Sequence, residues 1–144
     1  EFTPTEEHQA FPGMVNGGII GTLLDCHGNW TAAIALMDQS GDPEPPCTVT
    51  ASYSIKLRRP TPFRSILRVK SKVVEIGEDR ASVMMSLSAD GKVCATGEGL
   101  FVAVKEGHPA FTLELIDTRH PLERPNQSSP MDDGGEMVGL EEFE

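Results

Sequence analysis

The chain has 144 residues, with 12 basic against 22 acidic side chains and a formal net charge of -10. A chain of this length is expected to form one domain whose core needs no disulfide or metal staple. The acidic excess argues against nonspecific nucleic-acid binding, which needs clustered Lys and Arg. No apolar run approaches the roughly 20 residues that cross a bilayer, so a membrane is not an expected partner either.

The three cysteines, Cys26, Cys47 and Cys94, are odd in number and widely separated. They lack the paired spacing of metal ligands, so we expect no metal site. Reduced thiols are more typical of intracellular proteins than of secreted ones. The cysteines therefore predict a soluble protein of the cytoplasm.

The first long pattern in the chain is an apolar run that predicts a helix from Gly17 to Met37. Asn16 is a favourable N-cap, and Gly41 with the prolines after it prevents the helix from continuing. Before the helix, a first strand is expected to end near Phe2, with its beginning upstream of Glu1. This helix is apolar nearly all round, which predicts that it is buried.

After the helix the apolar period changes to two, which is typical of half-buried strands. The first strand places alternate residues on one face: Val49, Ala51, Tyr53, Ile55 and Leu57. Further strands are expected over residues 67–73, 81–88 and 92–105, and Asp90-Gly91 is a strong hairpin signal between the last two. Short turns between successive strands predict a four-stranded antiparallel meander packed against the helix.

The end of the chain has a different composition. Residues 1–105 carry the regular patterns, whereas residues 106–144 form an acidic extension rich in Pro, Ser and Gly. Such a segment buries too little apolar surface to offset its ordering entropy, which predicts a largely flexible tail. The alternative is a partner-binding tail anchored by Met137, Val138, Leu140 and Phe143.

The segment Asn16-Gly17-Gly18, with Asp25 eight residues after Gly17, is the most informative motif. The first N–H groups of a helix have no intrahelical acceptor, so the Gly17 N–H can stabilise a carbonyl oxygen that gains negative charge. At about 1.5 Å per residue, Gly17 and Asp25 are roughly 12 Å apart along one helix. If both act on one carbonyl, they come from two antiparallel copies of the helix and the site is shared between subunits.

Asp25 lies among apolar neighbours, and two interpretations of it are open. A buried carboxylate must be paired, hydrogen-bonded or neutralised, and such groups concentrate where chemistry occurs. Alternatively, Asp25 lies at a partly wet edge of the helix and is bonded to a neighbouring side chain.

The segment from Glu6 through Asp25, together with the strand end Lys56-Leu57-Arg58-Arg59-Pro60, resembles the hotdog-fold acyl-CoA thioesterases of the PaaI-like group. The resemblance covers about residues 1–105. It implies an α+β hotdog fold, in which an antiparallel sheet wraps around one long central helix. It also implies a thioester hydrolase that acts on an acyl-CoA as a homodimer or a dimer of dimers, with CoA as part of the substrate and no separate cofactor.

The resemblance also implies roles for individual residues. The Gly17 N–H polarises the thioester carbonyl, and Gly18 beside it contributes to substrate binding. Asp25 of the other subunit acts as general base or nucleophile. Thr50, found by counting back from Pro60, orients the water or the acid. Where the family usually has His, this chain has Asn16, which caps the helix or contacts the substrate but cannot carry a proton near neutral pH.

The other feature with a functional interpretation is a basic cluster made of Lys56, Arg58, Arg59 and Arg64. It is either a solvated strand end or a contact for the phosphates of CoA. Two further functions remain open. One is an acyl-CoA or lipid-binding module without catalysis, which Asn16 favours. The other is a hotdog dehydratase of 3-hydroxyacyl thioesters, for which His8 is the available loop histidine.

Overall fold

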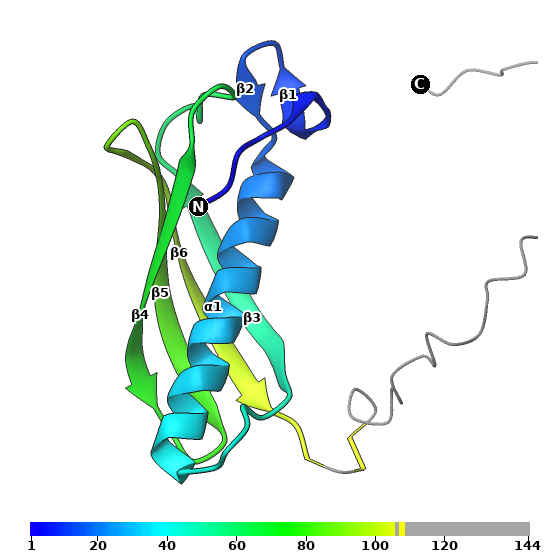
Figure 1. The fold of residues 1–144 in the computed structure, drawn as a ribbon, viewed down its shortest axis with the longest axis vertical. Coiled ribbons are helices and arrows are strands. Elements are labelled where there is room, and N and C mark those ends of the chain that lie inside the picture. The colour runs from blue at the N-terminus through cyan, green and yellow to red at the C-terminus, as the bar shows by residue number, and fades with distance from the viewer. Residues whose placement is uncertain (106, 109–144) are drawn as a thin grey trace, which may run out of the picture. The chain divides into compact units, whose positions relative to one another are not determined.

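The computed structural model describes residues 1–105, 107 and 108, so the predicted acidic extension lies outside the described residues apart from residues 107 and 108. The described chain contains one long helix and a principal sheet of four strands (Figure 1). In chain order the elements are η1 (Glu6–His8), β1 (Gln9–Phe11), β2 (Met14–Val15), α1 (Gly17–Ser40), β3 (Thr48–Leu57), β4 (Leu67–Ile76), β5 (Arg80–Ala89) and β6 (Lys92–Ala103).

Helix α1 begins at the predicted residue and ends three residues beyond the predicted Met37. At its start, the Asn16 side-chain oxygen accepts a hydrogen bond from the Gly18 N–H at 2.7 Å, which confirms the predicted N-cap. At its end, Gly41 adopts a left-handed conformation with φ 74°, and its N–H donates to the Met37 carbonyl at 2.9 Å. Local chemistry therefore fixes both ends of the helix.

The principal sheet has the order β3-β6-β5-β4, and every neighbouring pair is antiparallel. Strands β4, β5 and β6 form the predicted meander, with Asp90 and Gly91 both at positive φ in the turn between the last two. The expected pairing of β3 with β4 is wrong, because β3 lies beside β6 instead. The connection from β3 to β4 carries the chain to the opposite edge, and hydrogen bonds from the Val15 and Phe63 N–H groups attach it to the segment before α1.

Helix α1 lies across one face of this sheet (Figure 1). This arrangement confirms the predicted α+β hotdog fold. Gly28 lets the helix approach closely, because a Cβ there would lie 2.8 Å from Cζ of the buried Phe101 and would also overlap the sulfur of Met85. Within the described chain the helix buries one face rather than its whole surface, since Trp30 and Ile34 are 59% and 47% exposed.

The N-terminal segment reaches β4, as expected for a strand that ends near Phe2. Phe2 and Leu67 exchange two backbone hydrogen bonds, of 2.9 and 2.8 Å.

No helix in the described part of the chain is long and apolar enough to span a membrane.

A bulge in β3 changes the predicted alternation of its side chains. The pairing of β3 with β6 shifts between Thr50 and Ser52, so one extra residue is inserted there. Thr50 therefore faces the helix together with Ile55 and Leu57, although an unbroken strand would place it on the opposite face. Bulges commonly re-aim side chains in this way next to functional sites.

Candidate active site

Asp25 of α1 and Thr50 of β3 are joined by a hydrogen bond within one chain. The Thr50 hydroxyl donates to the Oδ1 atom of Asp25 at 2.8 Å, and both residues are half-buried. The Oδ2 atom of Asp25 has no hydrogen-bond partner among the described residues. Thr50 therefore orients the carboxylate while one of its oxygens stays available to a ligand. Asp25 thus lies at a partly wet helix edge and is bonded to a neighbour, and its second oxygen is available for the catalytic role of the other interpretation.

A second polar pair lies beside the first and was missed from the sequence. The Thr48 hydroxyl donates to the Asn29 side-chain oxygen at 2.8 Å, and the Asn29 amide donates to the Thr48 carbonyl at 3.2 Å. Asn29 lies one helical turn after Asp25, and Thr48 lies two residues before Thr50. The sequence signal for this pair was its spacing. Asn29 follows Asp25 by four residues on the helix, and Thr48 precedes Thr50 by two residues on the strand, so each pair of side chains shares a face. This pair fastens the start of β3 to the helix next to the candidate site.

The Gly17 N–H occupies the position at the start of α1 that the motif predicts. Asn16 caps the helix through the Gly18 N–H, so the N–H of Gly18 is already used. The Gly17 N–H, in contrast, donates to no acceptor among residues 1–105, 107 and 108. Gly17 lines a hollow of about 380 Å³ together with Arg58 and Arg59. The structure thus brings the candidate oxyanion donor and two of the predicted phosphate contacts to one place.

Lys56 does not share this hollow. Its side chain lines a separate hollow of about 180 Å³ together with Ser54 and Glu98. Alternation along β3 explains the difference, because Leu57 faces the helix and the preceding residue points the other way. Arg58 lines both hollows.

One chain does not bring Gly17 and Asp25 together. Helix α1 is continuous from Gly17 to Ser40, so the two groups keep the separation of roughly 12 Å that eight helical residues impose. A single carbonyl cannot contact both groups of the same chain.

His8, the loop histidine considered for a dehydratase, takes part in the entry to the helix. Its Nδ1 atom accepts a hydrogen bond from the Thr5 N–H at 2.9 Å, and its ring packs edge-on against Phe2. Its backbone carbonyl accepts from the Asn16 N–H at 2.8 Å. These contacts give His8 a structural role in the segment before α1.

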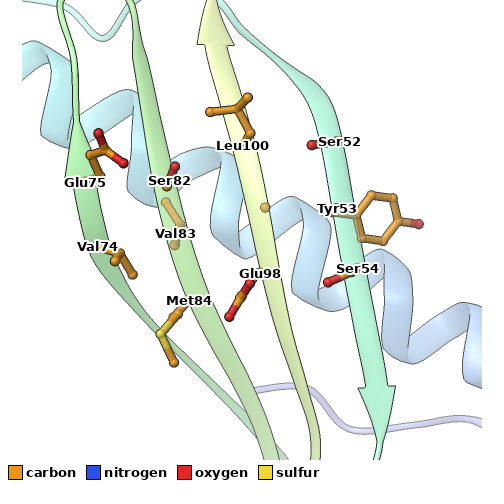
Figure 2. A pocket seen from close by; sticks show the side chains of 11 residues that line it. Ser52, Tyr53, Ser54, Val74, Glu75, Ser82, Val83, Met84, Glu98 and Leu100 are labelled. Atoms are coloured by element: carbon orange, nitrogen blue, oxygen red, sulfur yellow. The ribbon is translucent and has the colours of Figure 1, made fainter.

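The face of the sheet turned away from α1 carries a further hollow, of about 480 Å³ (Figure 2). Figure 2 shows Ser82, Met84, Glu98 and Leu100 projecting from neighbouring strands on this side, with the helix behind the sheet. None of the predicted site residues lines it. The candidate catalytic groups, Gly17, Asp25 and Thr50, therefore lie on the helix side of the sheet, away from this hollow.

Comparisons with known proteins agree with this fold. The sequence model of the thioesterase-like superfamily matches residues 9–133 of the chain. The crystal structure of a thioesterase superfamily protein from Shewanella loihica PV-4 is 32% identical, with a TM-score of 0.61, over 72% of this chain and 80% of that chain. No curated protein sequence matches this chain.

Two more distant structures share the fold alone. A phenylacetic acid degradation-related protein from Ralstonia eutropha JMP134 is 24% identical, with a TM-score of 0.58, over 71% of this chain and 72% of that chain. A protein from Streptococcus mutans UA159, solved with acetyl CoA bound, is 16% identical, with a TM-score of 0.61, over 72% of this chain and 77% of that chain. The family match and the 32% identical relative carry the assignment. The chain belongs to the thioesterase-like superfamily and is a thioester hydrolase.

Proposed function

We propose that this protein hydrolyses an acyl-CoA thioester at a site shared by two copies of the chain. Asp25 of one subunit activates water, and the Gly17 N–H of the other holds the carbonyl oxygen. The observation that carries the proposal is the hydrogen bond from Thr50 to Asp25, because it leaves one carboxylate oxygen oriented and available. The acetyl CoA bound to the Streptococcus mutans neighbour supports a CoA ester as the substrate.

The chemistry needs one carboxylate and one oxyanion donor. Asp25 removes a proton from water, and the resulting hydroxide attacks the thioester carbon. The carbonyl oxygen gains negative charge and is stabilised by the Gly17 N–H at the positive end of α1. When the intermediate collapses, the carbon–sulfur bond breaks, and the CoA sulfur takes the proton back from Asp25. Direct attack by the carboxylate, through an acyl-enzyme anhydride, uses the same groups.

The outer edge of β3 is the surface through which we propose that the two copies meet. Within the described residues β3 pairs only with β6, and residues 51–54 in its middle are exposed. A long edge strand presents unpaired backbone N–H and C=O groups, which a second copy of the same strand can satisfy. An isologous contact of this kind has two-fold symmetry.

The contacts between α1 and β3 support a symmetry axis level with Gly21 in this proposal. Gly21 packs against Ile55 and Tyr53 of β3, and Gly17 packs against Leu57, the last residue of that strand. Gly17 and Asp25 are each four residues, or about 6 Å along the helix, from Gly21. A two-fold axis level with Gly21 therefore brings Gly17 of one helix level with Asp25 of the other. This geometry gives two equivalent sites per dimer.

Arg58 and Arg59 are the proposed contacts for the phosphates of CoA. Both are exposed and line the hollow that Gly17 also lines. Guanidinium groups bind phosphate through paired hydrogen bonds. In this proposal CoA enters as part of the substrate, and the reaction uses only water and groups of the chain.

The test is a thiol-release assay of Asp25→Asn on acyl-CoAs of several chain lengths. Loss of a general base is expected to lower kcat by about 10²- to 10⁴-fold. Asp38→Asn is the matched control, because Asp38 is an exposed acid on the same helix and is expected to keep full activity. Unchanged turnover in a folded Asp25→Asn protein would remove Asp25 from the mechanism. Binding of CoA esters without hydrolysis by the unmodified protein would instead support the binding-module interpretation.

A further inference from the structure

Thr61, in the connection between β3 and β4, is buried without a partner for its hydroxyl. The residue is 2% exposed, and its Oγ1 atom makes no hydrogen bond to any described residue. A hydroxyl removed from water without a hydrogen-bond partner is destabilising, and for this reason almost all buried polar groups in native proteins are paired. The unpaired hydroxyl therefore calls for an explanation other than stability.

The position of Thr61 relates it to the start of α1. Its carbonyl accepts a hydrogen bond from the Val15 N–H at 2.9 Å, and Val15 lies two residues before Gly17. The next residue, Pro62, forms an antiparallel bridge with Met14. These contacts hold the connection against the segment that leads into the helix.

Thr61 and Gly17 line the same hollow of about 380 Å³. Two residues that line it thus carry donors without acceptors in the described chain: Gly17 through its backbone N–H, and Thr61 through its buried hydroxyl. Val15, Ile20 and Leu57 supply apolar lining. Arg58 and Arg59 line the same hollow. A ligand group that fits the two donors is a compact acceptor able to take two hydrogen bonds.

From this arrangement we infer that Thr61 is a catalytic residue whose hydroxyl donates a second hydrogen bond to the thioester carbonyl oxygen held by Gly17. The inference rests on the proposed function, which supplies a thioester carbonyl at this hollow. The hydroxyl forms and breaks no covalent bond. Its hydrogen bond strengthens as the carbonyl oxygen becomes negatively charged, which lowers the barrier to attack.

The experiment compares Thr61→Val with Thr61→Ser in the thiol-release assay. Valine has nearly the shape of threonine but no hydroxyl, whereas serine keeps the hydroxyl. Thr61→Val is expected to lower kcat by roughly 10²-fold with KM changed less than about twofold, because an oxyanion donor acts in the transition state. Thr61→Ser is expected to keep most of the activity.

Thermal unfolding of the same variants separates catalysis from structure. Because the Thr61 hydroxyl is unpaired, Thr61→Val is expected to leave the Tm unchanged or to raise it. Thr31→Val is the matched control, since the Thr31 hydroxyl donates to the His27 carbonyl at 2.8 Å and also contacts the Ser71 hydroxyl. That variant is expected to lower the Tm and to keep kcat.

Three results would overturn the inference. The first is unchanged kcat in Thr61→Val, and the second is a rise in KM alone, which would place the hydroxyl on another part of the substrate. The third is a lower Tm or loss of folded protein, which would give the hydroxyl a structural role. Asp25→Asn, assayed in parallel, separates these results from failure of the proposed function. Inactive Asp25→Asn beside active Thr61→Val rejects only the inference about Thr61, whereas active Asp25→Asn rejects the proposed mechanism.

Discussion

Replacing Gly17 by proline removes the backbone N–H that the mechanism uses and leaves the helix start intact. Proline is favoured at the first position of a helix, where the N–H has no intrahelical acceptor. The residue before a proline must be extended, and Asn16 already has φ -62° and ψ 136°. The substitution therefore deletes one donor with little change to the backbone.

The expected loss of activity follows from the role of that donor. Removing one oxyanion-hole hydrogen bond typically lowers kcat by about 10²- to 10³-fold, which corresponds to about 2.7–4 kcal/mol of transition-state stabilisation. The added ring atoms approach the side chain of Leu57, because a Cβ on Gly17 would lie 3.2 Å from its Cδ1 atom. The flexible end of this side chain can move, so we expect the Tm to change by only a few degrees.

Gly17→Ala is the control for the added atoms. Alanine brings the same Cβ against Leu57 but keeps the N–H. The ratio of kcat values for the alanine and proline variants, measured by thiol release from an acyl-CoA, isolates the contribution of the N–H. If the proline variant, folded and of native size, stays within about twofold of the alanine variant, Gly17 is not an oxyanion donor.

The remaining predictions concern the acid, the helix packing and an exposed ion pair. Thr50→Val removes the hydrogen bond to Asp25 and is expected to lower kcat by about tenfold, with Thr50→Ser retaining activity in the same assay. Gly28→Ala is expected to lower the free energy of unfolding by about 1–3 kcal/mol, measured with denaturant, because its methyl group would overlap two buried side chains of the sheet. The hydrogen bond and charge of Arg80 lower the pKa of the Asp79 carboxyl, so their stabilisation is present at neutral pH and is lost as the pH falls through that lowered pKa. Arg80→Gln should raise this pKa toward its ordinary value in an NMR titration; no change would contradict the pairing.

Local chemistry made parts of the fold predictable from the sequence. The N-cap at Asn16, the helix end near Gly41 and the turn at Asp90-Gly91 each depend on residues within a few positions of one another. The position of β3 beside β6 depends on how a long connection crosses the sheet. No local pattern encodes that crossing, so the predicted four-stranded meander was wrong for one strand.

The candidate site was predictable to a similar degree. Gly17 and Asp25 follow from a motif with helical spacing, and the contact of Thr50 with Asp25 agrees with the role that the family resemblance implies. The bulge after Thr50 was not predictable, because the sequence alternates smoothly through it. Thr61 was missed because its significance depends on burial and on the absence of a partner among the described residues, neither of which a sequence pattern reports.

The most direct test of the shared site mixes two inactive variants. In a dimer of one Asp25→Asn chain and one Gly17→Pro chain, one site carries both substitutions and the other carries neither. Random exchange of subunits at equal concentrations makes half of the dimers mixed, so the account predicts recovery of about a quarter of the unmodified activity. If the acid and the N–H act within one chain, every site stays defective. In that case no activity appears on mixing, which would contradict a site built from two subunits.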